Sequence, residues 1–191
     1  MEAERDRLLE LDRAMGDGDL GLTMTRAFAA ASQAAALDEP LPGKLLMRMG
    51  MAVSKAAPST MGTLVATGFM RGGKAVGEAP AMGVGELAAF FRGFVDGIID
   101  RGKTKPGNKT VVDSLDPAAT ALEEAAANGA SLISALASAA AAAEAGREAA
   151  KLMVAQHGRA AMFREETIGM DDGGAYVGAL IVRGFCEAVS A

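Results

Sequence analysis

Apolar residues recur every three to four positions along most of the chain, and breaks rich in glycine or proline separate the periodic segments. The residues after Gly85 are predicted to form a helix with one apolar face. Its members follow i, i+3, i+4 and i+7 spacing: Leu87, Phe90, Phe91, Phe94, Val95 and Ile98. Further helices are predicted over residues 2–15, 23–37, 45–55, 62–76 and 174–190. No segment alternates as a half-buried strand does. The pattern therefore predicts an all-α fold of about eight helices, and the length predicts one domain over residues 1–191.

The segments between these helices are less regular. Residues 101–109 and 157–173 are predicted to be loops. Asp116-Pro117 has the pattern of a helix N-cap followed by proline at the first helical position. An alanine-rich tract extends from there to about residue 155, with a break expected at Asn128-Gly129. A second break at Gly146 would divide the tract into three helices instead of two.

Composition and charge narrow the function classes. Aromatic residues make up 4% of the chain and hydrophobic residues 50%, a balance that favours packed helices over strands. The chain has 19 basic and 24 acidic residues and a net charge of −5, which argues against a general nucleic-acid binder. It has no apolar run of 18–20 residues and no secretory leader, so we expect a cytoplasmic protein without a membrane span. Cys186 and His157 are single residues of their kinds, which excludes a zinc cluster, and Cys186 is expected to be a buried core thiol.

Three carboxylates gather where the first predicted helix ends. Asp17 and Asp19 flank a glycine, so an extended backbone points both side chains the same way, and Asp12 lies on the preceding helix. Oxygen ligands without histidine or cysteine select Mg²⁺ or Ca²⁺. The residues after Asp19 lack the acidic positions of a calcium-binding EF-hand loop. A solvated turn with an aspartate cap would have the same spacing, so spacing leaves both interpretations open.

Two further loops could bind an anionic ligand. Residues 101–109 combine two glycines with four cations, namely Arg101, Lys103, Lys105 and Lys109. Glycines let backbone N–H groups approach a phosphate, although this order is not that of a P-loop, and a solvated basic loop fits equally well. The segment 167–174 is rich in aspartate and glycine and comes directly before a helix, where it could hold a ribose or cap the helix. A metal-competent loop together with a basic loop indicates a site for Mg²⁺ and phosphates.

Four motifs occur in one order along the chain: Gly16-Asp17-Gly18-Asp19-x-Gly21 after Asp12, Arg101-Gly102-Lys103-x-x-Pro106-Gly107-x-Lys109-Thr110, Gly158-Arg159-Ala160, and Ile168-Gly169-x-x-Asp172-x-Gly174. Together they resemble the nucleotide-binding L subunit, or L domain, of dihydroxyacetone kinases, from about residue 8 to residue 190. The resemblance implies an antiparallel barrel of eight helices with ADP or ATP at one end. It also implies that the family's first helix is largely absent from this sequence.

The resemblance implies roles for particular residues. Aspartates at the positions of Asp12, Asp17 and Asp19 hold two Mg²⁺ ions in that family, and Arg159 would stabilise phosphate. The nucleotide contacts that it implies are Leu20, Gly21, Leu22, Thr23, Ser59, Thr60, Gly102, Val111, Arg159, Asp172, Gly173 and Gly174. The function implied is phosphoryl donation from ADP- or ATP-bound protein to a ketose held by a separate K-type subunit. A phosphotransfer protein recharges the nucleotide in some members.

Some positions depart from the family pattern. Leu20 stands where histidine is usual, and Met170 stands in place of a polar residue. A non-catalytic regulatory module that binds Mg²⁺ and nucleotide is therefore the alternative function. A purely structural helical partner is a third class, which the three carboxylates disfavour.

Overall fold

The computed structural model describes residues 1–190 and confirms the all-α prediction, since no strand occurs among them. The helices of this part of the chain are η1 (Glu2–Glu4), α1 (Arg5–Met15), α2 (Leu20–Ala35), α3 (Pro42–Ala56), α4 (Thr60–Val76), α5 (Val84–Gly102), α6 (Val112–Ala127), α7 (Leu132–Ala150), η2 (Arg159–Thr167) and α8 (Gly173–Ser190). None of the helices in this range is long and apolar enough to cross a membrane.

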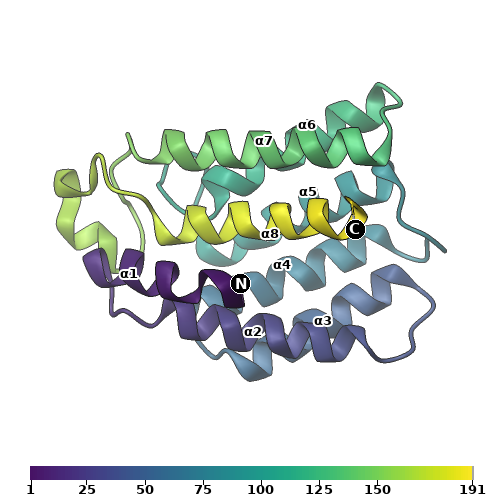
Figure 1. The fold of residues 1–191 in the computed structure, drawn as a ribbon, viewed down its shortest axis with the longest axis horizontal. Helices are drawn as coiled ribbons and strands as arrows, with labels where there is room; N and C mark the ends of the chain where they lie inside the picture. Colours follow the sequence, from purple (N-terminus) through teal and green to yellow (C-terminus); the bar gives the residue numbers. More distant parts are fainter. Residues whose placement is uncertain (191) are drawn as a thin grey trace.

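The α-helices form a ring in chain order. Each α-helix packs against the next one along the chain, and α8 packs against α7, α6 and α1, which closes the ring (Figure 1). Neighbouring helices joined by short connections run in opposite directions. The α1–α2, α3–α4, α5–α6 and α7–α8 connections therefore lie at one end of the ring, and residues from all four line a common cavity.

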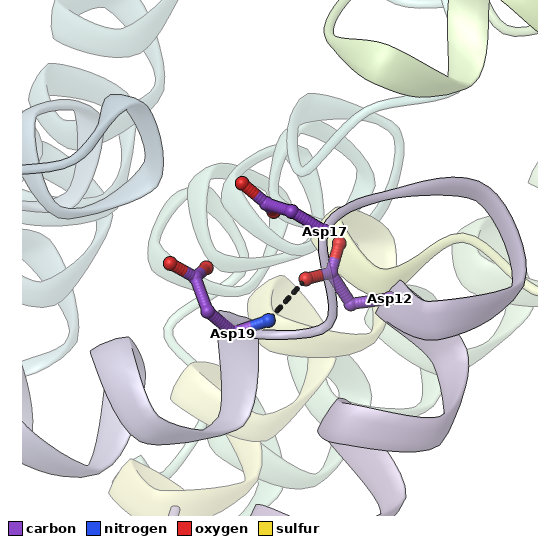
Figure 2. Close-up of side chains that lie close together, drawn as sticks. All are labelled: Asp12, Asp17 and Asp19. Atoms are coloured by element: carbon purple, nitrogen blue, oxygen red, sulfur yellow. Dashed lines mark hydrogen bonds between the residues drawn. The ribbon is translucent and has the colours of Figure 1, made fainter.

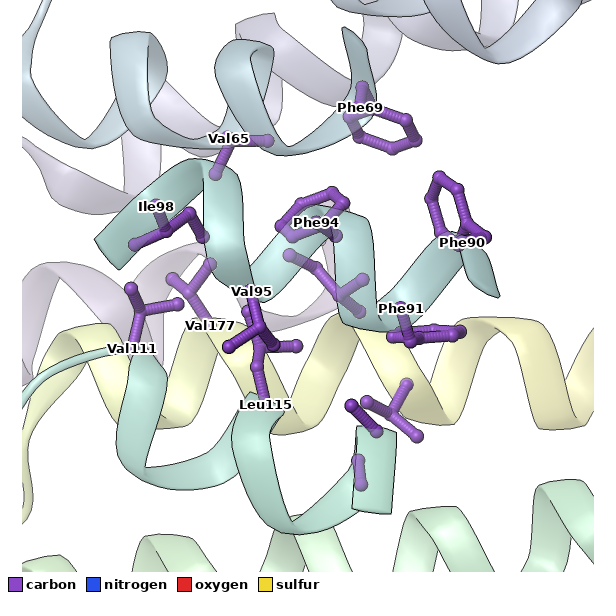
Figure 3. Close-up of a cluster of buried hydrophobic side chains, with 14 of the residues drawn as sticks. Val65, Phe69, Phe90, Phe91, Phe94, Val95, Ile98, Val111, Leu115 and Val177 are labelled. Carbon is purple, nitrogen blue, oxygen red and sulfur yellow. The ribbon is translucent and has the colours of Figure 1, made fainter. Parts of the chain in front are cut away.

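The predicted apolar face of α5 lies in the centre of the core. Phe90, Phe91 and Phe94 are completely buried, and Phe94 packs edge-on against Phe69 of α4 with ring centroids 5.3 Å apart (Figure 3). Val177 of α8 is buried in the same cluster. This core holds α4, α5, α6 and α8 together, so it fixes where their connections emerge.

The prediction that Asp116-Pro117 starts a helix is wrong. Helix α6 begins five residues earlier, at Val112, and Pro117 lies inside it. The buried carboxylate of Asp113 accepts hydrogen bonds from the N–H groups of Gly107 (2.5 Å) and Thr110 (2.6 Å), which stabilises the loop before the helix. Proline within a helix removes the bond to the carbonyl four residues back, here that of Asp113.

Gly146 does not break the alanine-rich tract. Helix α7 continues through it to Ala150, and the tract divides once, at residues 128–131. A Cβ atom on Gly146 would lie 2.2 Å from the carbonyl oxygen of Asp113. The glycine therefore permits close contact between α7 and α6, and α7 needs no break there.

Two further expectations are corrected by the structure. The segment predicted as a loop over 157–173 contains the 3₁₀ helix η2, with a non-helical residue at Arg164. Cys186 is half-buried at the edge of the core, because it lies near the end of α8 where fewer helices cover it.

Candidate functional site

A cavity of about 530 Å³ opens at the end of the ring where the four connections meet. Its wall combines apolar side chains from α1, α2 and α4 with polar groups from the connections. The lining residues predicted from the sequence are Asp12, Asp17, Asp19, Leu20, Thr23, Ser59, Thr60, Gly102, Val111, Arg159, Asp172, Gly173 and Gly174. Residues far apart in the sequence thus form one site.

Two predicted residues do not line the cavity. Gly21 faces α1, where a Cβ atom would lie 2.2 Å from the carbonyl oxygen of Arg5. The side chain of Leu22 is 42% exposed on the surface of the ring. Successive helical residues point in different directions, so a run of four along α2 cannot all face one cavity.

The three aspartates surround the turn between α1 and α2 (Figure 2). Oδ2 of Asp12 accepts hydrogen bonds from the N–H groups of Asp19 (2.8 Å) and Leu20 (3.1 Å), so Asp12 caps α2 from the preceding helix. One carboxylate oxygen from each of Asp12, Asp17 and Asp19 can be chosen so that all three lie within 4.8 Å of one another. The turn interpretation and the metal interpretation are therefore compatible, because Asp12 retains a second oxygen.

Gly16 allows the chain to turn tightly over the Asp12 carboxylate. A Cβ atom at this position would lie 2.0 Å from Oδ1 of Asp12, closer than any side chain tolerates. Glycine is thus required if the first aspartate is to reach the turn that carries the other two.

The electrostatics of the site favour a cation. Partial burial raises the pKa of Asp19, and the charges of Asp17 and Asp12 raise it further. Arg159 opposes these effects, and its guanidinium forms an ion pair of 2.9 Å with Asp17. The cluster thus has one ion pair, between Asp17 and Arg159, and a smaller favourable charge from Arg26 at Asp19; a divalent cation would stabilise the remaining negative charge.

The structure does not bring the four cations of 101–109 together. Arg101, Lys103 and Lys105 are exposed and lie outside the described cavity wall. Lys109 lines the cavity, but its Nζ donates to the backbone carbonyls of Thr167 (2.6 Å), Met170 (2.8 Å) and Lys151 (3.3 Å). The sequence pattern could not distinguish this buried lysine from its solvated neighbours.

Asp172 lines the cavity and caps the last helix. Its Oδ1 accepts a hydrogen bond from the N–H of Ala175 at 2.7 Å. Burial raises the pKa of Asp172 to about 6, although this hydrogen bond and the charge of Lys109 lower it. The helix-cap interpretation of the 167–174 segment is therefore confirmed, and Asp172 is also one of the residues that line the cavity.

Sequence reasoning missed several residues of the site. Met61 and Leu64 of α4 and Thr104 and Thr110 of the α5–α6 connection line the cavity, and Asp113 organises that connection from below. Their local patterns are those of ordinary core or loop residues. For Asp113 the sequence shows only an aspartate that follows a glycine-bearing loop, and its burial appears only in the structure.

The fold and the cavity define an all-helical domain with a carboxylate-bearing site at one end of a closed helical ring. Residues 14–187 match the DAK2 domain, and the chain belongs to this family. It is 34% identical over 173 residues to the ADP-binding subunit DhaL of the PEP-dependent dihydroxyacetone kinase of Escherichia coli, covering 90% of this chain and 82% of that one.

Other relatives are longer. The human triokinase/FMN cyclase is 32% identical over 189 residues, which cover 96% of this chain and 32% of that protein. In fold, the chain resembles the dihydroxyacetone kinase of C. freundii, with a TM-score of 0.72, 24% identity, and coverage of 98% of this chain and 32% of that one. The chain therefore spans about a third of these proteins' length.

Proposed function

We propose that this chain binds ADP or ATP with Mg²⁺ in the cavity and acts as the phosphoryl-donor subunit of a dihydroxyacetone-type kinase. The observation that carries the proposal is the convergence of Asp12, Asp17 and Asp19 on one wall of a cavity that also contains Arg159. The similarity to an ADP-binding subunit of E. coli supports the proposal that the ligand is a nucleotide. Residues 1–191 would serve as one nucleotide-binding domain.

The aspartates would hold the metal. Carboxylate oxygens are the ligands that Mg²⁺ prefers, and the donor set here contains no histidine or cysteine. Each carboxylate offers two oxygens, and the hydrogen bonds to the first turn of α2 engage one oxygen of Asp12. The remaining oxygens would be available to the two ions of the proposal. When bound, Mg²⁺ neutralises phosphate charge.

The other walls would position the nucleotide. Arg159, exposed beside Asp17, can exchange its carboxylate partner for a phosphate oxygen. The apolar wall formed by Leu11, Met61 and Leu64 can cover a base. The predicted contacts at Ser59 and Thr60, Gly102 and Val111, and Asp172 to Gly174 complete the lining, whereas Gly21 and Leu22 lie outside it.

The acceptor would come from a partner. A ketose needs convergent polar groups or a covalent attachment, and the single histidine, His157, is engaged at 3.3 Å by Asn108. Leu152 (79% exposed) and Met162 (75% exposed) lie on the α7–α8 connection, other residues of which line the cavity, and a K-type subunit could dock there. Because the E. coli relative is PEP-dependent, a phosphotransfer protein that recharges bound ADP is a second proposed partner.

Calorimetry tests the nucleotide proposal. Mg·ADP should bind the wild-type chain and lose most of its affinity in EDTA and in Asp17→Asn, because EDTA removes the metal and the substitution removes one of its anionic ligands. Asp38→Asn, an exposed aspartate between α2 and α3, is the matched control. Equal affinity with and without EDTA would contradict the metal role.

A coupled assay with dihydroxyacetone or erythrulose tests the transfer. Turnover should require a K-type subunit, because positioning of the acceptor supplies much of the rate. Nucleotide binding without turnover in the presence of that subunit would favour the regulatory module. Turnover by this chain alone would refute the proposal that a separate subunit holds the ketose.

A further inference from the structure

Lys109 is a buried lysine whose ammonium group is surrounded by main-chain oxygen atoms. Its residue is 2% exposed, and its Nζ donates to the carbonyls of Thr167 at 2.6 Å, Met170 at 2.8 Å and Lys151 at 3.3 Å. These acceptors lie 42 to 61 residues further along the chain. Lys109 thus joins the α5–α6 connection to the α7–α8 connection.

The three carbonyls belong to both limbs of the α7–α8 connection. Lys151 is on the limb that leaves α7, whereas Thr167 and Met170 are on the limb that returns to α8. The limbs also bond to each other, through Gly169 N–H to Lys151 O (2.7 Å) and Ala155 N–H to Thr167 Oγ1 (3.0 Å). The ammonium therefore lies where the two limbs meet, at the base of the loop formed by residues 156–166, which we call the excursion.

Arg159 is carried by that excursion. Its guanidinium reaches Asp17 at 2.9 Å, although the side chain is 62% exposed and forms no other ion pair or side-chain hydrogen bond within residues 1–190. The position of the guanidinium consequently depends on the backbone of η2. That backbone is fixed at its base, where Lys109 lies.

The lysine itself is held rigidly. Asp113 binds the N–H groups of Gly107 and Thr110 on either side of Lys109, whose φ is +57°. Burial lowers the pKa of Lys109, and the nearby carboxylates of Asp172 and Asp171 oppose that shift. Asn108 adds neutral bonds to Gln156 and His157, but these do not screen the converging carbonyl dipoles.

We propose that Lys109 is a positioning residue of the nucleotide site, whose ammonium acts as a tethered monovalent cation at the base of the 151–172 connection and thereby sets Arg159 beside Asp17. The inference rests on the proposed function for its consequence in nucleotide binding. Three carbonyl oxygens pointing at one place repel one another without a cation, so loss of the charge would loosen the excursion. The helices of the ring, held by the apolar core, would stay in place.

The test compares Lys109→Ala, Lys109→Met and the control Lys105→Ala, which removes an exposed lysine from the same loop. Amide hydrogen exchange is measured over residues 151–172 and over the core helices, and Mg·ADP affinity is measured by calorimetry. Both Lys109 variants should exchange at least about tenfold faster in 151–172 and bind Mg·ADP about 10- to 100-fold more weakly, as is usual when a supporting group is lost. The control should match wild type.

Chemical rescue of Lys109→Ala distinguishes the effect of the lost charge from the effect of the lost packing. Propylammonium replaces the atoms that Lys109→Ala lacks, whereas propanol fills the same space without charge. Propylammonium should restore slow exchange and affinity, and propanol should not. Equal rescue by both, or wild-type exchange and affinity in Lys109→Met, would overturn the proposal.

The hydrogen-exchange measurement tests the role of Lys109 independently of the proposed function. If wild type binds no Mg·ADP, the proposed function fails, and exchange over 151–172 still decides the role of Lys109. Lys109→Met keeps the apolar stem and serves if Lys109→Ala does not fold. Global unfolding of both variants would refute the proposal, since Lys109 would then support the whole ring and not one connection.

Discussion

At Gly146 we expect replacement of glycine by alanine to destabilise the protein, the reverse of its usual effect inside a helix. In an exposed helix, replacing glycine by alanine stabilises by about 0.5–1 kcal/mol, because alanine loses less conformational entropy. At Gly146 the added Cβ would lie 2.2 Å from Asp113 O and 3.1 Å from Cγ of Pro117. Ordinary contact begins at 3.4 Å, so α7 and α6 would have to separate by about 1 Å.

The cost of that separation exceeds the gain in helix propensity. Overpacking typically costs about 1–3 kcal/mol, and a clash with a backbone oxygen falls at the upper end because no rotamer change relieves it. The net effect expected for Gly146→Ala is a loss of about 2 kcal/mol in the free energy of unfolding. For a chain of this length that lowers Tm by about 4–8 °C.

Gly184→Ala is the matched control. Gly184 also lies inside a helix, α8, but nothing lies within 4 Å of a Cβ placed there. This variant should raise Tm by about 1–4 °C. Thermal unfolding followed by circular dichroism measures both. A Tm for Gly146→Ala at or above that of wild type would refute the close-packing explanation, as would changes of the same sign in the two variants.

Two further predictions concern the carboxylates of the site. Mg·ADP at 100 times its Kd should stabilise wild type by about 2.7 kcal/mol, and Asp19→Asn should lose that gain while Asp38→Asn keeps it; a full gain in Asp19→Asn would exclude Asp19 from the metal site. Because the pKa of Asp172 is raised from 3.8 to about 6 on folding, its contribution to stability is complete below pH 4 and is lost as the pH rises through 6. Asp172→Asn keeps a capping oxygen, so its stability relative to wild type should improve by about 2 kcal/mol between pH 4 and pH 7.5, measured by urea unfolding. A pH-independent difference would show that Asp172 does not titrate in this way.

The class of fold and the metal-competent turn could be predicted from the sequence alone. The phenylalanines of α5 repeat with helical spacing, and such a stripe has to be buried whatever the neighbouring helices are. Asp12, Asp17 and Asp19 lie within eight positions, so the geometry of one helix end and one turn brings them together. Both results depend on short-range relations, which a linear pattern carries. The order of the motifs supplied the family, which the comparison with known proteins confirmed.

Features that depend on contacts between distant segments could not be predicted in this way, because they are set by the folded chain as a whole. Lys105 and Lys109 have the same local setting, yet one is solvated and the other is buried among carbonyls from residues 151–170. Gly146 has the composition signature of a helix break and is a packing contact, because its neighbour is Asp113 on another helix. The energy of a charge or a missing Cβ depends on the atoms around it, and those atoms are assembled when the ring closes. No local pattern specifies them.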